Sequence, residues 1–149
     1  MKKIVIAAIL GMMCGGVSAA PASKSCSKLR KCSGVVREIV NGKWENTSAG
    51  KSIDIPEGKL FCMGATYNNP GVKFDNGVSF IVHVIRKENR ILANQTLDAS
   101  IVYMLESTFV LSSSDTQKPV INSLGSIDSG FLGASAMIDG RYYDVVCTQ

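Results

Sequence analysis

The chain has few of the groups on which metal centres and many enzymes depend. Its 149 residues include one histidine, one tryptophan and four prolines, and only 19% of them are charged. A single histidine excludes a metal centre built from several imidazoles, and a net charge of only +4 argues against a dedicated nucleic-acid binder. Hydrophobic residues make up 46% of the chain, too many for an intrinsically disordered protein. One domain with a buried core is therefore expected.

Known catalytic and nucleotide-binding motifs are also missing. The sequence contains no Gly-x-Ser-x-Gly, no P-loop and no Gly-x-Gly-x-x-Gly. His83, the one candidate for a general base near neutral pH, lies in an apolar run, where packing or a place on the sheet surface is expected rather than catalysis. We therefore expect a protein that is not an enzyme and has no cofactor. A small hydrolase that uses paired carboxylates is the less favoured alternative.

The N-terminus has the three parts of a secretory signal peptide. A cationic start of two lysines precedes an apolar run at 4–13, which is too short to span a bilayer. Small side chains at Val17 and Ala19 place the expected cleavage after Ala19. The sequence therefore predicts a signal peptide at 1–19 and a single exported domain at 20–149.

The compartment follows from this signal. Cys14 offers an alternative, acylation as a lipoprotein, but Met13 is larger than the residue expected before such a cysteine. Without the two signal lysines, 14 basic residues stand against 12 acidic ones, so the mature net charge is +2. The mature sequence has no apolar stretch long enough for a transmembrane helix. We expect a periplasmic protein, with secretion as the alternative.

Four cysteines remain after cleavage: Cys26, Cys32, Cys62 and Cys147. An even number in an exported chain predicts two disulfides. A redox or metal site is disfavoured, because there is no Cys-x-x-Cys and only one histidine. Three pairings are possible. We favour Cys26–Cys32, which closes a short loop, and Cys62–Cys147, which ties the last strand to an early one.

Two segments have helical spacing. Apolar residues recur at three- and four-residue steps over 23–40, which predicts an amphipathic helix that ends at Asn41-Gly42. Segment 97–111 is ambiguous, since a four-residue apolar spacing favours a helix and its β-branched residues favour a strand. We favour a helix followed by a strand in 97–111.

The remaining segments favour strands. Asp75-Asn76-Gly77 separates short apolar runs, and the run at 78–85 is apolar enough for a central strand. Asp139-Gly140 separates 135–138 from 141–147 in the same way. The dipeptides Asn76-Gly77 and Asp139-Gly140 both suit type I′ turns, so two hairpins are predicted. The expected fold class is α+β, mostly antiparallel β, with an N-terminal helix, two hairpins and two disulfides.

Two groups of residues are candidates for binding. The densest positive cluster lies on the predicted N-terminal helix and consists of Lys24, Lys28, Arg30 and Lys31. We favour a solvated helix face as the explanation of this cluster, and contact with an anionic surface is the alternative. Tyr142 and Tyr143 point to opposite faces of a strand, so one belongs in the core and the other is available as an interface anchor.

These observations favour a non-enzymatic accessory protein. A small, exported, disulfide-bonded domain is suited to bind a protein partner in the bacterial envelope and to support a pilus or secretion apparatus. The alternative is a secreted inhibitor or a host-facing binding protein, which uses a rigid scaffold to present loops.

Overall fold

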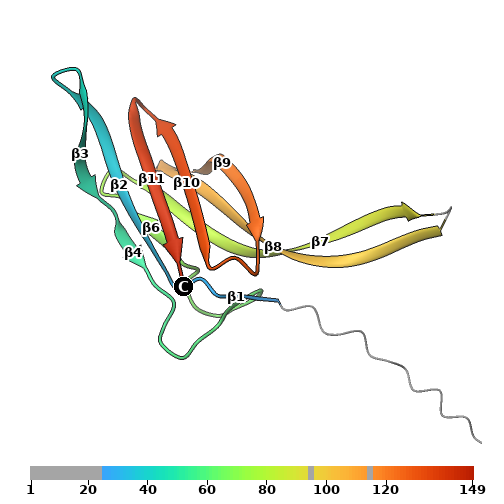
Figure 1. The fold of residues 1–149 in the computed structure, drawn as a ribbon. Coiled ribbons are helices and arrows are strands. Elements are labelled where there is room, and N and C mark those ends of the chain that lie inside the picture. Colours follow the sequence, from blue (N-terminus) through green and yellow to red (C-terminus); the bar gives the residue numbers. More distant parts are fainter. Residues whose placement is uncertain (1–24, 94–95, 114–115) are drawn as a thin grey trace, which may run out of the picture.

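The computed structural model describes residues 25–93, 96–113 and 116–149. Every regular element in these residues is a β-strand, and the strands form three antiparallel sheets (Figure 1). The predicted richness in β structure is confirmed. The α+β class is wrong, because the described residues contain no helix. The predicted signal peptide at 1–19 lies outside the described residues.

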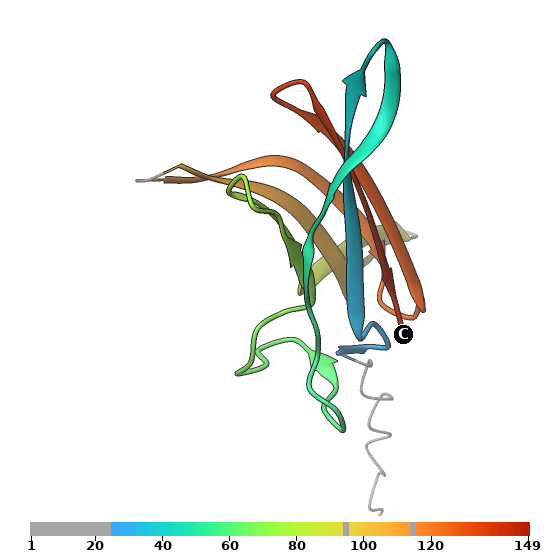
Figure 2. The ribbon, with the colours of Figure 1, turned by 90° about the vertical axis from the view of Figure 1, so that its left-hand side faces the viewer.

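Two larger sheets form the two layers of a sandwich (Figure 2). The four-stranded sheet has the order β10 (Phe131–Ile138), β11 (Arg141–Thr148), β2 (Lys31–Val40) and β3 (Lys43–Ala49). The five-stranded sheet has the order β4 (Lys51–Ile53), β6 (Gly71–Lys73), β7 (Val78–Ala93), β8 (Thr96–Ser113) and β9 (Thr116–Ser126). A small third sheet pairs β1 (Cys26–Ser27) with β5 (Phe61–Cys62).

The core lies between the two larger sheets, because each strand turns alternate residues toward its inner face. In β7, the alternate residues Val78, Phe80 and Val82 are buried. The prediction that this strand is central is confirmed, because β7 is the middle strand of its sheet. Tyr143 of β11 meets Phe109 of β8 with ring centroids 6.4 Å apart, so aromatic rings from the two sheets touch. The opposite face of each sheet points away from this core.

The helix predicted for 23–40 is absent, since this segment contains β1 and β2. Cys32 and Val36 are buried at alternating positions of β2, as a half-buried strand requires. Leu29 is buried in the loop before β2, three residues ahead of Cys32, and its position imitated the spacing of a helix. Asn41-Gly42 does not end a helix but forms the tight turn between β2 and β3, with positive φ at both residues.

The helix favoured for the first part of 97–111 is absent as well, because β8 runs through the whole segment. Leu105 and Phe109 lie on the inner face, opposite Val84 and Phe80 of β7. Residues i and i+4 share one face in a helix and also in a strand. The four-residue apolar spacing therefore did not distinguish the two, and the β-branched content was the better guide.

Both predicted hairpins form, but only one has the predicted turn. Asp139 and Gly140 have φ values of 48° and 76°, the two positive values that a type I′ turn needs. In the first hairpin only Gly77 has a positive φ, and its amide donates to the carbonyl three residues earlier. This is the pattern of a type I turn followed by a left-handed glycine bulge, which suits a longer hairpin loop.

Two disulfides form as predicted, but the favoured pairing is wrong. Cys26 bonds to Cys62, which lies opposite it in the small sheet. Cys32 bonds to Cys147, which lies opposite it where β2 pairs with β11. Cys26 and Cys32 are close in sequence, yet they lie in different sheets because the chain changes sheets between them. Each bridge thus joins directly paired strands.

The chain passes from the four-stranded to the five-stranded sheet at Gly50, between β3 and β4. The Gly50 amide donates to the carbonyl of Gly34 at 2.9 Å, which holds the crossing against β2. A Cβ atom at position 50 would lie 2.0 Å from Cγ1 of the fully buried Val72. Only glycine lets the crossing chain approach this part of the core so closely.

Gly50→Ala is therefore expected to lower the free energy of unfolding by about 1–3 kcal/mol, because the added methyl group forces Val72 to move within a packed core. Urea denaturation of the purified domain measures this. Ser48→Ala, on exposed β3, is the matched control and should change stability by no more than about 0.5 kcal/mol. Equal stability of the two variants would contradict the tight crossing.

Candidate functional site

Three surface features stand out: an apolar patch, a projecting pair of strands and a cavity. The patch, which we call the aromatic face, lies on the outer side of the four-stranded sheet and consists of Arg37, Ile39, Trp44, Met137 and Tyr142. Trp44 and Tyr142 have ring centroids 6.0 Å apart, and the Arg37 guanidinium lies 6.0 Å from the Tyr142 centroid. Ile39, Trp44 and Met137 are each about half exposed or more. Tryptophan, tyrosine and arginine are the residues most often found at interface hot spots.

Among the predicted binding residues, the two tyrosines lie on opposite faces, as expected. Tyr143 is buried in the core, while Tyr142 is half-buried on the aromatic face. Tyr143 is therefore a core residue rather than a surface anchor. Arg37 also pairs with Asp144 at 3.3 Å, so the Arg37 side chain is held over the Tyr142 ring.

The predicted basic cluster is not gathered on a helix face, because that helix does not exist. Lys24 lies outside the described residues. Lys28 and Lys31 are exposed, on the loop before β2 and at its first position. Arg30 is half-buried and donates to the backbone carbonyl of Lys59. Arg30 thus anchors a loop, and the contact of this cluster with an anionic surface stays a prediction.

The projecting feature consists of the outer parts of β7 and β8, residues 86–93 and 96–103, which we call the arm. These residues pair only with each other, from Arg86 opposite Tyr103 to Ala93 opposite Thr96. β6 pairs with β7 only at 79–81, and β9 pairs with β8 only from Met104 onward. Eight residues per strand make the arm about 26 Å long at about 3.3 Å per residue. Figure 1 shows it extending well beyond the two sheets.

The arm leaves two strand edges without a ladder partner in the described residues. Apolar residues recur at alternate positions of its second strand, at Leu97, Ala99, Ile101 and Tyr103. Ile101 is 43% exposed, so it adds an accessible apolar side chain to the arm. Unpaired edges with exposed apolar residues are templates for pairing with another chain.

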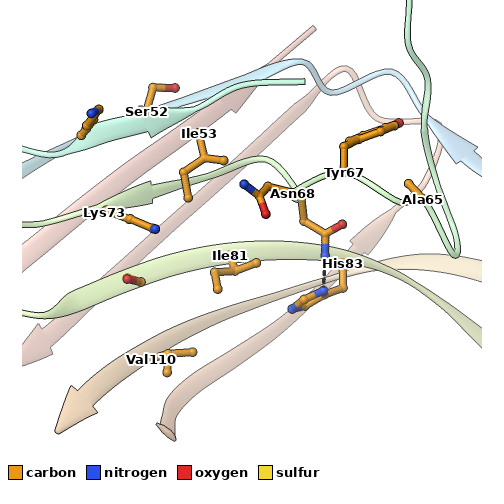
Figure 3. Close-up of a pocket in the computed structure, with 12 residues that line it drawn as sticks. Ser52, Ile53, Ala65, Tyr67, Asn68, Lys73, Ile81, His83 and Val110 are labelled. Atoms are coloured by element: carbon orange, nitrogen blue, oxygen red, sulfur yellow. Dashed lines mark hydrogen bonds between the residues drawn. The ribbon is translucent and has the colours of Figure 1, made fainter. Parts of the chain in front are cut away.

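The third feature is a cavity of about 640 Å³ on the outer face of the five-stranded sheet, which we call the outer cavity. Its floor is made by β4, β6, β7 and β8, and the loop after β5 forms one wall (Figure 3). It is lined by Lys51, Ser52, Ile53, Ala65, Tyr67, Asn68, Asn69, Lys73, Ser79, Ile81, His83 and Val110.

His83 lies on this outer face, in agreement with the expected place on a sheet surface. It is half-buried, and its Nδ1 pairs with the side-chain amide of Asn69, so a neutral ring would carry its proton on Nε2. Glu106 lies directly opposite it on β8. The group bonded to His83 is thus an amide, whereas nucleophilic catalysis needs a hydroxyl or thiol within reach of the base.

Within the described residues, no cluster of three or more His, Cys, Asp or Glu side chains is placed to hold a metal ion, and no helix is long and apolar enough to cross a membrane. The two disulfides are compatible with a protein that folds outside the cytoplasm.

Sequence reasoning found part of the aromatic face, through Tyr142, but not the arm or the outer cavity. The arm had a signal, because 97–101 alternates between apolar and polar residues, but the helix interpretation concealed it. The cavity had none, since its lysines and histidine are far apart in sequence. Comparisons with protein-family models, with curated proteins and with solved structures found no match to this chain.

Proposed function

We propose that this protein is a non-enzymatic binding protein of the bacterial envelope that supports the assembly or stability of a surface apparatus such as a pilus or secretion system. The observation that carries the proposal is the arm. A two-stranded ribbon with no further ladder partner in the described residues is marginally stable alone in water, so its length is hard to explain by the stability of the domain.

Binding by strand addition would use the arm directly. A partner strand that lies along either free edge receives backbone hydrogen bonds, and the exposed side chain of Ile101 supplies an apolar contact. The sandwich would act as a rigid holder, because β7 and β8 continue from the arm into the middle of the five-stranded sheet. The aromatic face offers a second contact surface on the other layer.

Removing the arm is expected to abolish partner binding and leave the fold intact. In the variant, residues 86–103 are replaced by Asn-Gly, which joins Ile85 to Met104, two residues that already lie opposite each other. The sandwich should still unfold cooperatively, since every fully buried core residue lies outside the excised residues and only Tyr103, which is partly buried against the core, is lost with the arm. Binding is measured by photo-crosslinking in the native cells, with the reactive side chain at exposed Lys87 and, as a control, at exposed Lys59.

A discrete adduct at Lys87 that is absent at Lys59 supports the proposal, provided that the complex is lost in the variant without the arm. A complex that survives arm removal contradicts it. Cell fractionation addresses the alternative, a secreted inhibitor or host-facing protein: release of the mature chain into the medium would favour that function over a role in the envelope.

A further inference from the structure

The outer cavity gathers positive charge at one end. Lys51 of β4 lies directly opposite Lys73 of β6, and both lysines line the cavity. Like charges at directly opposed positions of a sheet destabilise it. Among the described residues neither lysine takes part in an ion pair, and the lining of the cavity contains no carboxylate. The lysine pair is thus left for an anion that comes from outside the protein.

The other end of the cavity is polar and lies next to a carboxylate. His83 is bonded to Asn69 there, and Glu106 lies beside it on β8, outside the lining. Lys73 lies opposite Ser79, and His83 follows Ser79 by four positions along β7. The two ends are therefore about 13 Å apart at about 3.3 Å per residue. The carboxylate of Glu106 repels an anion at this end, so the charge of a ligand belongs at the lysine end.

The middle of the cavity combines apolar and hydrogen-bonding surface. Ile81 and Val110 form part of the floor, Ser79 lies beside them, and Asn68 points into the cavity from the wall (Figure 3). Tyr67 donates its hydroxyl hydrogen to the carbonyl of Leu60, which fixes the aromatic ring in the wall. A largely preformed cavity with amides, hydroxyls and one aromatic wall suits a ligand that has many hydroxyl groups and apolar ring faces.

We propose that the outer cavity binds an acidic disaccharide, with the carboxylate or phosphate of one sugar held by Lys51 and Lys73 and the second sugar reaching Asn69 and His83. The distance between the two ends exceeds one sugar ring and accommodates two linked rings. Sugars of this chemistry occur in bacterial surface polymers and on host cells. The site is independent of the arm, since none of the residues that line it belongs to 86–93 or 96–103.

The test is NMR titration of the isotope-labelled mature protein with three probes: a glucuronosyl-glucose disaccharide, which has a single carboxylate, trehalose 6-phosphate and neutral maltose. We expect shifts at the backbone amides of residues that line the cavity with one or both acidic probes, and none with maltose at the same concentration. Comparison of the two acidic probes shows whether the site prefers a carboxylate or a phosphate. Rising salt should weaken binding, because both lysines are exposed.

Lys73→Gln is expected to weaken binding of the acidic probe about tenfold, as loss of a charge-assisted hydrogen bond does. The fold should be retained, since the substitution relieves the repulsion from Lys51; Lys51→Gln provides a second variant. Lys43→Gln removes an exposed lysine of β3, outside the cavity, and should bind as the unmodified protein does.

Equal binding of maltose, an equal loss in Lys43→Gln, or no shift with either acid would overturn the proposal. None of these outcomes bears on the arm, whose role is tested by crosslinking.

Discussion

Joint replacement of Cys32 and Cys147 by alanine is expected to lower the free energy of unfolding by about 5 kcal/mol. This is the chain-entropy value for a loop with a sequence separation of 115 residues. A domain of this size has about 5–15 kcal/mol in total, so a large fraction of the protein should unfold. The bridge joins β2 to β11 at the centre of the four-stranded sheet, and both cysteines are buried.

Chemical denaturation under oxidising conditions measures the effect, with Cys26→Ala and Cys62→Ala together as the matched variant. That bridge closes a separation of 36 residues and holds only the small sheet, so its loss should reduce stability by about 4 kcal/mol or less. Single substitutions at Cys32 and Cys147 should be equivalent. Peptide mapping of the unreduced protein that linked Cys62 to Cys147 would contradict the pairing.

Tyr143→Ala is expected to lower the free energy of unfolding by about 3–5 kcal/mol. The Tyr143 ring is buried, and its centroid lies 5.1 Å from that of Phe74 and 6.4 Å from that of Phe109. It therefore contacts two other aromatic residues of the core. Truncation leaves a cavity between the two sheets that the rigid strands cannot fill. The hydroxyl also accepts a hydrogen bond from the side chain of Asn76, which ties the core to the β6–β7 turn.

Two neighbouring variants separate these contributions in thermal or urea denaturation. Tyr143→Phe keeps the ring and loses only the hydrogen bond, so a loss of about 0.5–1.5 kcal/mol is expected. Tyr142→Ala removes the adjacent tyrosine from the outer face and should alter stability by about 1 kcal/mol or less. If Tyr142→Ala were the more harmful of the two alanine substitutions, the assignment of inner and outer faces would be reversed.

Local turn chemistry was the part of the fold that the sequence predicted best. Asp139-Gly140 and the loop that ends at Gly77 both mark hairpins, because few residues other than glycine accept a positive φ cheaply. Asn41-Gly42 carried the same information. It was assigned to the end of a helix only because the segment before it had helical spacing. The dipeptide was the stronger signal of the two.

Helix and strand were confused where apolar residues recur every four positions. Leu97, Ile101, Leu105 and Phe109 share a face in either conformation, so period alone could not decide. The cysteine pairing failed for a related reason. Loop length favours Cys26–Cys32, but pairing depends on which strands become neighbours, and β11 reaches β2 only through the complete topology.

The candidate surfaces were predictable only in part. Tyr142 follows from strand alternation, but its contact with Trp44 depends on the β2–β3 hairpin, which was not expected. The cavity joins Lys51, Lys73 and His83 from three strands, and no spacing in the sequence brings them together. The cluster that was dense in sequence, near Lys28, is dispersed because that segment is extended rather than helical.

The position of β11 also sets the order of events when the protein is made. β11 is the last strand of the chain, yet it lies between β10 and β2, so the four-stranded sheet cannot close before the final residues arrive. In a chain synthesised N-terminus first, β2 waits with one open edge and with Cys32 unpaired. The cysteines available to Cys32 before Cys147 emerges are then Cys26 and Cys62. A bridge from Cys26 to Cys62 is the native one, but a bridge from Cys32 to either of them would have to be undone by disulfide exchange, which is slow without an isomerase.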